Sequence, residues 1–200
     1  MTDGALIKKF CDGEVNAFNT LVWRWQKPIF NFVLRYVGDA EDAREITQQT
    51  FIKAYRNLPT LKEHSRFSTW LYQIAVNLCR DEIKRRQRKR TFSLEGMQEN
   101  FEPSHPPIAM TVADDAANPD KILSRKELRD ILAQALQQIP EEQRVVVVMK
   151  EYQGLKFTEI AEALGIPLNT AKSRMYYGLT ALRKILTQWQ FDQESLQYEM

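Results

Sequence analysis

The stretch KFTEIAEALGIPLNTAKSRMYYGLTALRKIL, residues 156–186, has the pattern of two helices joined by a tight turn. Apolar residues recur at helical spacing in each half, and Gly165 stands between them, where glycine readily ends a helix in a left-handed conformation. Asn169 is expected to be the N-cap of the second helix. The inward face of that helix is predicted to carry Ala171, Met175, Leu179, Leu182 and Leu186. The stretch therefore predicts a helix-turn-helix.

The outward face of the second helix is polar and basic, with four bases and no acid between Asn169 and Leu186. A helix of this kind can enter the major groove of DNA, where its N-terminal side chains reach base edges. The outward arc of this helix carries Lys172, Ser173, Tyr176, Tyr177, Thr180 and Lys184, with Arg174 and Arg183 at its margins. A helical hairpin with a solvated basic face is the alternative, and the pattern alone leaves both open.

The residues before this stretch are also helical in pattern. Residues 123–139 are amphipathic, and Pro140 ends that pattern. Val145 to Val148 alone would favour a strand, but the length and flanks of their segment favour a buried helix that ends at Gly154. A second domain is therefore predicted over residues 123–187. The tail 188–200 is expected to be either a disordered remnant or a regulatory helix.

The first part of the chain predicts a separate helical domain, residues 1–90, with helices over 17–37, over 40–58 and from Ser68 onward. Asp39 is expected to be the N-cap of the middle helix. The outer face of that helix carries Glu45, Gln48, Gln49, Ile52 and Arg56. An isoleucine is unusual in such a polar set, although single exposed apolar residues are common in proteins.

The third helix passes from an aromatic beginning to a cationic end, RFSTWLYQIAVNLCRDEIKRRQRKR, residues 66–90. Its last part, residues 80–90, contains seven bases and two acids, which provides capacity for phosphate binding. An aromatic side chain upstream, such as Trp70, can stack against an unpaired base. Two alternatives stay open: the charge run can be a solvated helix end, and Trp70 can belong to the core.

Residues 91–120 contain no lysine or arginine, six acids and four of the eight prolines, and helical periodicity is lost there. This composition predicts a flexible acidic linker over residues 91–122. The fold class predicted is therefore all-α, with two small helical domains joined by that linker.

Composition excludes several classes of function. Cys11 and Cys79 are far apart and form no metal-binding or disulfide pattern, which suits a reducing cytosol. There is no phosphate-binding glycine loop, and neither His64 nor His105 has a convincing catalytic partner. The N-terminus lacks a signal-peptide core, and no apolar run is long enough for a membrane span. We expect a soluble intracellular protein that is not an enzyme and has no cofactor, metal or small-molecule substrate.

The order and spacing of these pieces resemble the extracytoplasmic-function (group IV) sigma factors of bacterial RNA polymerase. The resemblance covers roughly residues 5–186 and is carried by DAEDAREITQQTFIKAYRNL, FSTWLYQIAVNLCRDEIKRR and the IPEEQRVVVVMKEYQGLKFTEIAEALGIPLNTAKSRMYYGLTALRKIL stretch. It implies that residues 1–90 form a sigma-2 domain, which opens the minus-ten element, and that residues 123–187 form a sigma-4 domain, which reads the minus-thirty-five element.

The resemblance also implies three sets of site residues. The polymerase-clamp site would comprise Glu45, Gln48, Gln49, Ile52 and Arg56, although Gln49 stands where the family often has an acid. The minus-ten site would comprise Arg66, Phe67, Ser68, Trp70, Asn77, Arg80 and Lys84. The minus-thirty-five site would lie on the second helix of the helix-turn-helix and comprise Asn169, Thr170, Lys172, Ser173, Arg174, Tyr176 and Tyr177.

The partners implied by the resemblance are core RNA polymerase, promoter DNA and an anti-sigma factor, which in this family is often membrane-anchored. The chain would act in the bacterial cytoplasm, or be held at the membrane by that anti-sigma factor. A stand-alone transcriptional regulator that uses only the helix-turn-helix is the alternative function. That alternative leaves the first domain unexplained.

Overall fold

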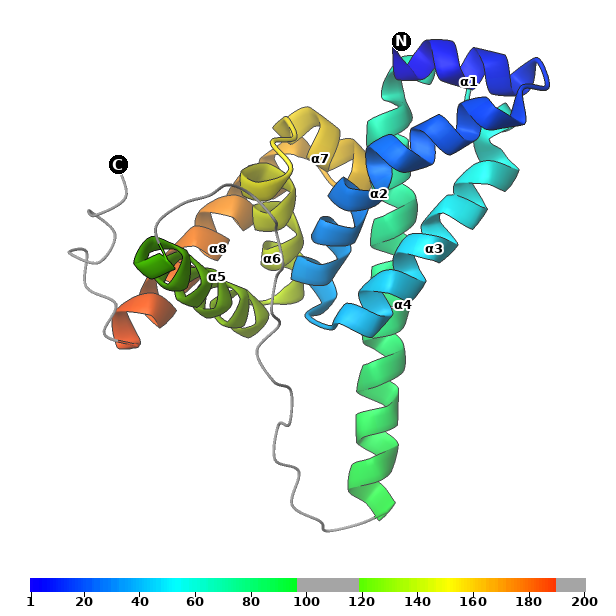
Figure 1. Cartoon of the computed structure of the whole chain (residues 1–200). Helices are drawn as coiled ribbons and strands as arrows, with labels where there is room; N and C mark the ends of the chain where they lie inside the picture. Colours follow the sequence, from blue (N-terminus) through cyan, green and yellow to red (C-terminus); the bar gives the residue numbers. More distant parts are fainter. Residues whose placement is uncertain (97–118, 190–200) are drawn as a thin grey trace.

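The computed structural model describes residues 1–96 and 119–189, with side chains described at 1–89 and 127–189. Every regular element in these ranges is helical, and the helices form two groups in the order of the sequence (Figure 1). The predicted all-α fold with two helical domains is confirmed. Most of the predicted linker lies outside the described residues. The flanking helices extend into it, to Gly96 on one side and from Pro119 on the other.

The first domain is built from four helices and two short 3-10 turns. These are α1 Asp3–Cys11, α2 Val15–Val37, α3 Ala40–Asn57, η1 Leu58–Thr60, η2 His64–Arg66 and α4 Phe67–Gly96. Asp39 caps α3 as predicted, because its carboxylate accepts hydrogen bonds from the backbone N–H groups of Glu41 and Asp42, each at 2.9 Å. Gly38, with φ of +80°, ends α2 immediately before this cap.

Helix α1 was not among the predicted elements. Leu6 and Ile7 are buried, and they attach the helix to the rest of the domain. Asp3 adds polar contacts, because it pairs with Arg24 and accepts a hydrogen bond from Trp25 Nε1 at 3.1 Å. Helix α1 therefore belongs to the core of the first domain.

The second domain contains α5 Pro119–Gln138, α6 Glu141–Val147, the single π-helical segment η3 Val148–Tyr152, α7 Phe157–Leu164 and α8 Leu168–Gln188. Val145 to Val148 are buried in helical structure, which confirms the predicted buried helix. Helices α7 and α8 form the predicted helix-turn-helix. Gly165 joins them with φ of +65°, the left-handed conformation that glycine adopts most easily.

Two details of α8 differ from expectation. The helix begins at Leu168 after Pro167, so Asn169 lies inside its first turn and is not the N-cap. Leu179 is 46% exposed, and Gly178 is buried in its place. The reason is the close approach of α6, since a Cβ added at Gly178 would lie 2.7 Å from Val147 Cγ2.

The two domains pack against each other along α2 and α4. Helix α7 contacts α4, and the end of α2 contacts α5, α6 and η3 (Figure 1). Helix α4 is buried at Tyr72, Val76 and Cys79, in addition to the predicted core positions Leu71, Ala75 and Leu78. The Tyr72 ring packs against Phe32 of α2, with centroids 5.3 Å apart, and its hydroxyl reaches Gln153 of the second domain. Helix α4 is thus shared between the cores of both domains.

Candidate functional site

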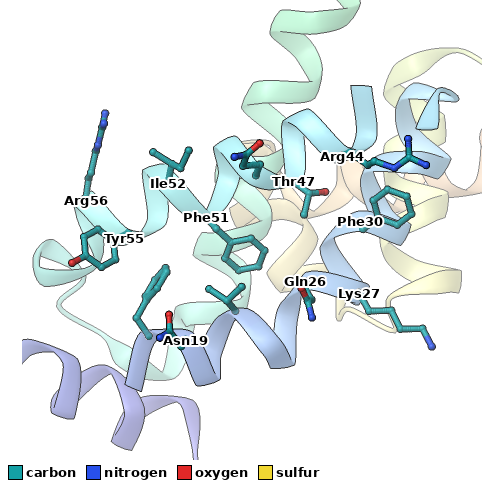
Figure 2. A pocket seen from close by; sticks show the side chains of 13 residues that line it. Asn19, Gln26, Lys27, Phe30, Arg44, Thr47, Phe51, Ile52, Tyr55 and Arg56 are labelled. Atoms are coloured by element: carbon teal, nitrogen blue, oxygen red, sulfur yellow. The ribbon is translucent and has the colours of Figure 1, made fainter. Parts of the chain in front are cut away.

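A groove of about 990 Å³ lies between α2 and α3 (Figure 2). Buried Phe18 and Phe51 contribute to its lining, and Ile52 and Tyr55, each 44% exposed, line it while remaining open to solvent. The Tyr55 ring is held edge-on, with its centroid 5.1 Å from that of Phe18 and 5.2 Å from that of Phe10. The groove therefore offers a preformed apolar surface that can accept the apolar side of a helix.

The charged residues that line the groove are all basic: Lys27, Arg44 and Arg56. Lys27 and Arg44 lie at one end in Figure 2, and Arg56 lies at the other. Amide side chains of Asn19, Gln26 and Gln48 also line it. An apolar groove with cations near both ends suits an amphipathic helix that carries acidic residues.

The predicted clamp residues share α3 but divide between two sides of it. Gln48, Ile52 and Arg56 line the α2–α3 groove. Glu45 and Gln49 instead border a second, polar cleft of about 510 Å³ between α3 and α4. The Gln49 side-chain amide donates to the Glu45 carboxylate at 2.9 Å, so these two side chains already interact with each other.

The polar stripe predicted on α4 is present. Asn77 and Lys84 are exposed, and Arg80 is half-buried. Part of the cationic run that follows is used within the domain, because Arg85 pairs with Glu82, and Arg86 pairs with both Glu82 and Asp42. Arg88 and Lys89 are exposed. The stripe can therefore present cations to a nucleic-acid backbone, but with fewer of them than the sequence count indicates.

The aromatic beginning of α4 requires a correction. Phe67, predicted to face DNA, is only 1% exposed and packs edge-on against Trp25, with ring centroids 6.1 Å apart. Because α4 begins at Phe67, the first helical turn directs this ring into the core. Trp70 is half-buried, and its ring centroid lies 6.0 Å from that of Phe67. Ser68 is also half-buried, so Trp70 and Ser68 keep part of their surface open.

Arg66 stands immediately before α4 and is exposed. Its guanidinium pairs with Glu63 at 2.6 Å and with Glu162 of α7 at 3.0 Å. One predicted minus-ten residue is therefore held by the second domain in this conformation. The sequence could not indicate that pairing, because 96 positions separate the partners.

The outer face of α8 is the most exposed of the predicted site surfaces. Asn169, Lys172 and Ser173 are exposed, and Tyr176 and Tyr177 are 69% and 59% exposed, with ring centroids 5.6 Å apart. Thr170 is half-buried. Arg174 is turned aside, because it pairs with Glu142 at the start of α6. Six of the seven predicted side chains are therefore available for contact with DNA along one face. Arg174 instead links α8 to α6 through its ion pair with Glu142.

Metal sites and membrane-spanning helices are both absent from the part of the chain that the structure describes. Within residues 1–96 and 119–189, no three His, Cys, Asp or Glu side chains are arranged to hold a metal ion. Among the helices described, none combines the length and apolar character needed to cross a membrane.

The sequence matches two family descriptions, one in each domain. Residues 21–89 match Sigma-70 region 2, and residues 129–182 match Sigma-70, region 4. The first match covers α3, most of α2 and most of α4, and the second covers the helix-turn-helix through Leu182. The predicted assignment of the two domains to these regions agrees with both matches.

Curated relatives match along nearly the whole chain. The RNA polymerase sigma-H factor of Pseudomonas aeruginosa is 32% identical over 186 residues, which cover 92% of this chain and 93% of the relative. The ECF RNA polymerase sigma-E factor of Escherichia coli K12 is 33% identical over 184 residues, which cover 91% of this chain and 93% of the relative.

Solved structures share the fold at lower identity. CnrH, solved in complex with the cytosolic domain of CnrY, matches with a TM-score of 0.65 and 21% identity over 92% of this chain and 97% of its own. The sigma factor RpoE of Bartonella quintana, solved with the anti-sigma factor NepR, matches with a TM-score of 0.66 and 19% identity over 86% of this chain and 98% of its own. The paired region matches and the full-length relatives lead to one conclusion: this chain belongs to the ECF sigma factors of the sigma-70 family and is not an enzyme.

Proposed function

We propose that this sigma factor binds core RNA polymerase and directs it to promoters through three surfaces. The polymerase surface is the α2–α3 groove with Gln48, Ile52 and Arg56, flanked by Glu45 and Gln49 on the other side of α3. The observation that carries this proposal is the open apolar groove beside the 44% exposed Ile52. A clamp helix of the polymerase that presents apolar and acidic side chains fits its lining and its cations.

The minus-ten surface is the outer stripe of α4 with the residues that precede it. Asn77, the sharpest candidate for base readout, can hydrogen-bond a base edge, and Lys84 can hold phosphates of the strand. Arg66, Ser68, Trp70 and Arg80 complete the set. Phe67 supports this surface from the core. Capture of an unstacked base on this stripe would offset part of the cost of opening the duplex, which is a few kcal/mol, ~2–4 for one base.

The minus-thirty-five surface is the outer face of α8. Asn169, Thr170, Lys172, Ser173, Tyr176 and Tyr177 would lie in the major groove, with base edges read near the N-terminal end of the helix. Arg174 would act indirectly, because its ion pair with Glu142 fixes α8 against α6.

Regulation by an anti-sigma factor is part of the proposal. CnrH and the Bartonella RpoE, which share this fold, were each solved with a bound partner. The chain would act in the cytoplasm, and a membrane-anchored anti-sigma factor would hold it at the membrane when inactive.

The test is transcription in vitro with core polymerase on a library of genomic fragments, followed by mapping of the start sites. We expect starts at a common promoter sequence only when the chain is added. Gel shifts with and without core separate this function from a stand-alone regulator. Tight promoter binding without core, combined with no new start sites in its presence, would overturn the proposal.

A further inference from the structure

The C-terminal end of α2 is capped by side chains from the second domain. The last carbonyl groups of a helix have no partner within it and need donors from elsewhere. The Gln137 side-chain amide donates to the Arg35 carbonyl oxygen, and Arg144 Nη1 donates to the Tyr36 carbonyl oxygen, each at 2.9 Å. The positive charge of Arg144 is also favourable at this negative end of the helix dipole.

The same two side chains are linked to each other and to their own domain. Arg144 donates to the Gln137 side-chain oxygen and to the backbone oxygens of Gln137 and Ile139 at 3.0 and 3.1 Å. Gln137 lies so close to Gly38 that an added Cβ would be 2.7 Å from Gln137 Cδ. The end of α2 therefore fits a preorganised donor pair.

Two buried tyrosines on the first domain extend this contact. Tyr36 donates its hydroxyl to the Glu141 carboxylate, and Tyr72 donates its hydroxyl to the Gln153 side-chain oxygen, each at 2.7 Å. Burial raises the pKa of both hydroxyls, so they stay protonated donors. At the rim of the contact Arg35 lies over the Tyr152 ring, 4.3 Å from its centroid, and Arg66 pairs with Glu162.

We propose that these contacts form an interdomain latch that holds the free chain closed and unable to bind both promoter elements. The latch comprises Arg35, Tyr36, Arg66 and Tyr72 on the first domain and Gln137, Glu141, Arg144, Tyr152, Gln153 and Glu162 on the second. The inference rests on the proposed function, because it assumes that α4 binds the minus-ten element and α8 the minus-thirty-five element.

Distance is the physical reason for the inhibition. By their names the two elements are about 25 base pairs apart, which is roughly 85 Å at 3.4 Å per base pair. In the closed chain Tyr72 of α4 is hydrogen-bonded to Gln153, which lies just before α7, the helix that leads into α8. Helix α8 has 21 residues and is therefore about 31 Å long. The closed chain cannot span the promoter, so the domains must separate.

Closure also affects the minus-ten surface directly. Arg66, which immediately precedes α4, is paired with Glu162 of the second domain. Asn77 and Lys84 remain exposed on the outer side of α4. In the closed chain Asn77 and Lys84 therefore stay available to a DNA strand, whereas Arg66 is occupied by Glu162.

Cys79 provides a native reporter of opening. It lies on the same side of α4 as Tyr72, is fully buried, and has a thiol pKa raised by burial and then by the nearby Glu141 carboxylate of the second domain. Separation of the domains would expose it, whereas Cys11 on α1 is exposed already. Alkylation rates at the two cysteines, followed by mass spectrometry of the full chain, therefore measure opening against an internal reference.

The decisive variant is Tyr36→Phe combined with Tyr72→Phe, which keeps both rings and removes two interdomain hydrogen bonds. We expect alkylation of Cys79 about tenfold faster, because losing two hydrogen bonds shifts the closed–open equilibrium by about that factor. The rate at Cys11 should not change. Tyr55→Phe is the matched control, since the Tyr55 ring lies in the α2–α3 groove away from the latch.

A charge variant tests the rim separately. Glu162→Lys removes the pairing with Arg66 and should also increase the alkylation rate of Cys79. Glu127→Lys is the control, because it makes an equal charge change at an exposed position of α5 and should leave that rate unchanged. Circular dichroism must show intact helices in each variant. The proposed latch would be contradicted by an unchanged rate of Cys79 alkylation in the double tyrosine variant. A small-angle scattering profile showing that the free native chain is extended would contradict it as well. A native chain that supports transcription with core yet is extended when free would remove the latch and leave the proposed function standing.

Discussion

Gly178 of α8 lies directly against Val147 of α6, and a Cβ on Gly178 would come within 2.7 Å of Val147 Cγ2 and 3.3 Å of Gln143 Cβ. The glycine is needed for space here. On an exposed helix Gly→Ala would stabilise by up to about 1 kcal/mol, but overpacking a core contact costs about 1–3 kcal/mol. The second effect is the larger at this site.

We therefore predict that Gly178→Ala lowers the free energy of unfolding by about 1–2 kcal/mol, because α8 must shift away from α6. Urea denaturation followed by circular dichroism measures the change. Combining it with Val147→Ala should recover part of the loss by making room for the new methyl group. A more stable single variant would show that α6 and α8 do not approach as closely as described.

Replacement of Ile52 by glutamate should weaken binding to core polymerase at least tenfold, about 1.4 kcal/mol, because a charge would be placed beside the apolar groove. The fold should not change, since Ile52 is 44% exposed. Fluorescence anisotropy of the labelled chain with core measures the affinity. Val15→Glu, at a 55% exposed valine that does not line the groove, serves as the control. Equal losses in both variants would argue against the groove as the docking surface.

Asn77→Ala should impair opening of the promoter more than initial binding, since the exposed amide is proposed to contact the separated strand and not the duplex. We expect a drop of about tenfold in the opening step, the effect of losing one or two hydrogen bonds to a base. Permanganate footprinting reports unpaired thymines, and gel shifts of the holoenzyme report initial binding. Normal promoter melting in this variant would contradict the proposed role of Asn77. Asn16→Ala on α2 is the control and should melt the promoter normally.

The two kinds of side chain on the face of α8 should respond differently. Lys172→Ala should weaken holoenzyme binding to all minus-thirty-five sequences alike and reduce the salt slope by about 0.9 for each phosphate that is no longer neutralised. Tyr176→Ala should change which sequence is preferred, because an aromatic side chain in the groove contacts bases. Binding to a randomised minus-thirty-five library at two salt concentrations distinguishes these results. A uniform loss in both variants would mean that Tyr176 does not read sequence.

Local signals were sufficient to predict most of the fold. Asp39 as a cap, Gly165 as a turn and the four valines from Val145 each act through neighbours within a few residues, and all three predictions are confirmed. Asn169 failed as a cap because Pro167 allows the helix to begin one residue before it. The failure at Leu179 had a different cause, since the closeness of α6 decided which residue of α8 faces inward.

Contacts between distant segments could not be predicted. The prediction that Phe67 faces DNA is wrong because aromatic residues near a basic helix suit both core and contact, and only the position of Trp25 decides between them. The hydrogen bond from Tyr72 to Gln153 of the second domain was also out of reach of sequence patterns, because 81 positions separate the two residues. The role of each predicted site residue stays a prediction until it is tested.

The α2–α3 groove shares no lining residue with the latch, and Ile52 is open to solvent while the domains are closed. Polymerase can therefore dock on the groove before the domains separate, so binding and opening should be two successive steps. The observed rate of Cys79 exposure should then rise with polymerase concentration at first and level off at the rate of opening itself. A chain that had to open first would instead give a rate that does not increase with polymerase concentration, and the order of events at the start of transcription would be reversed.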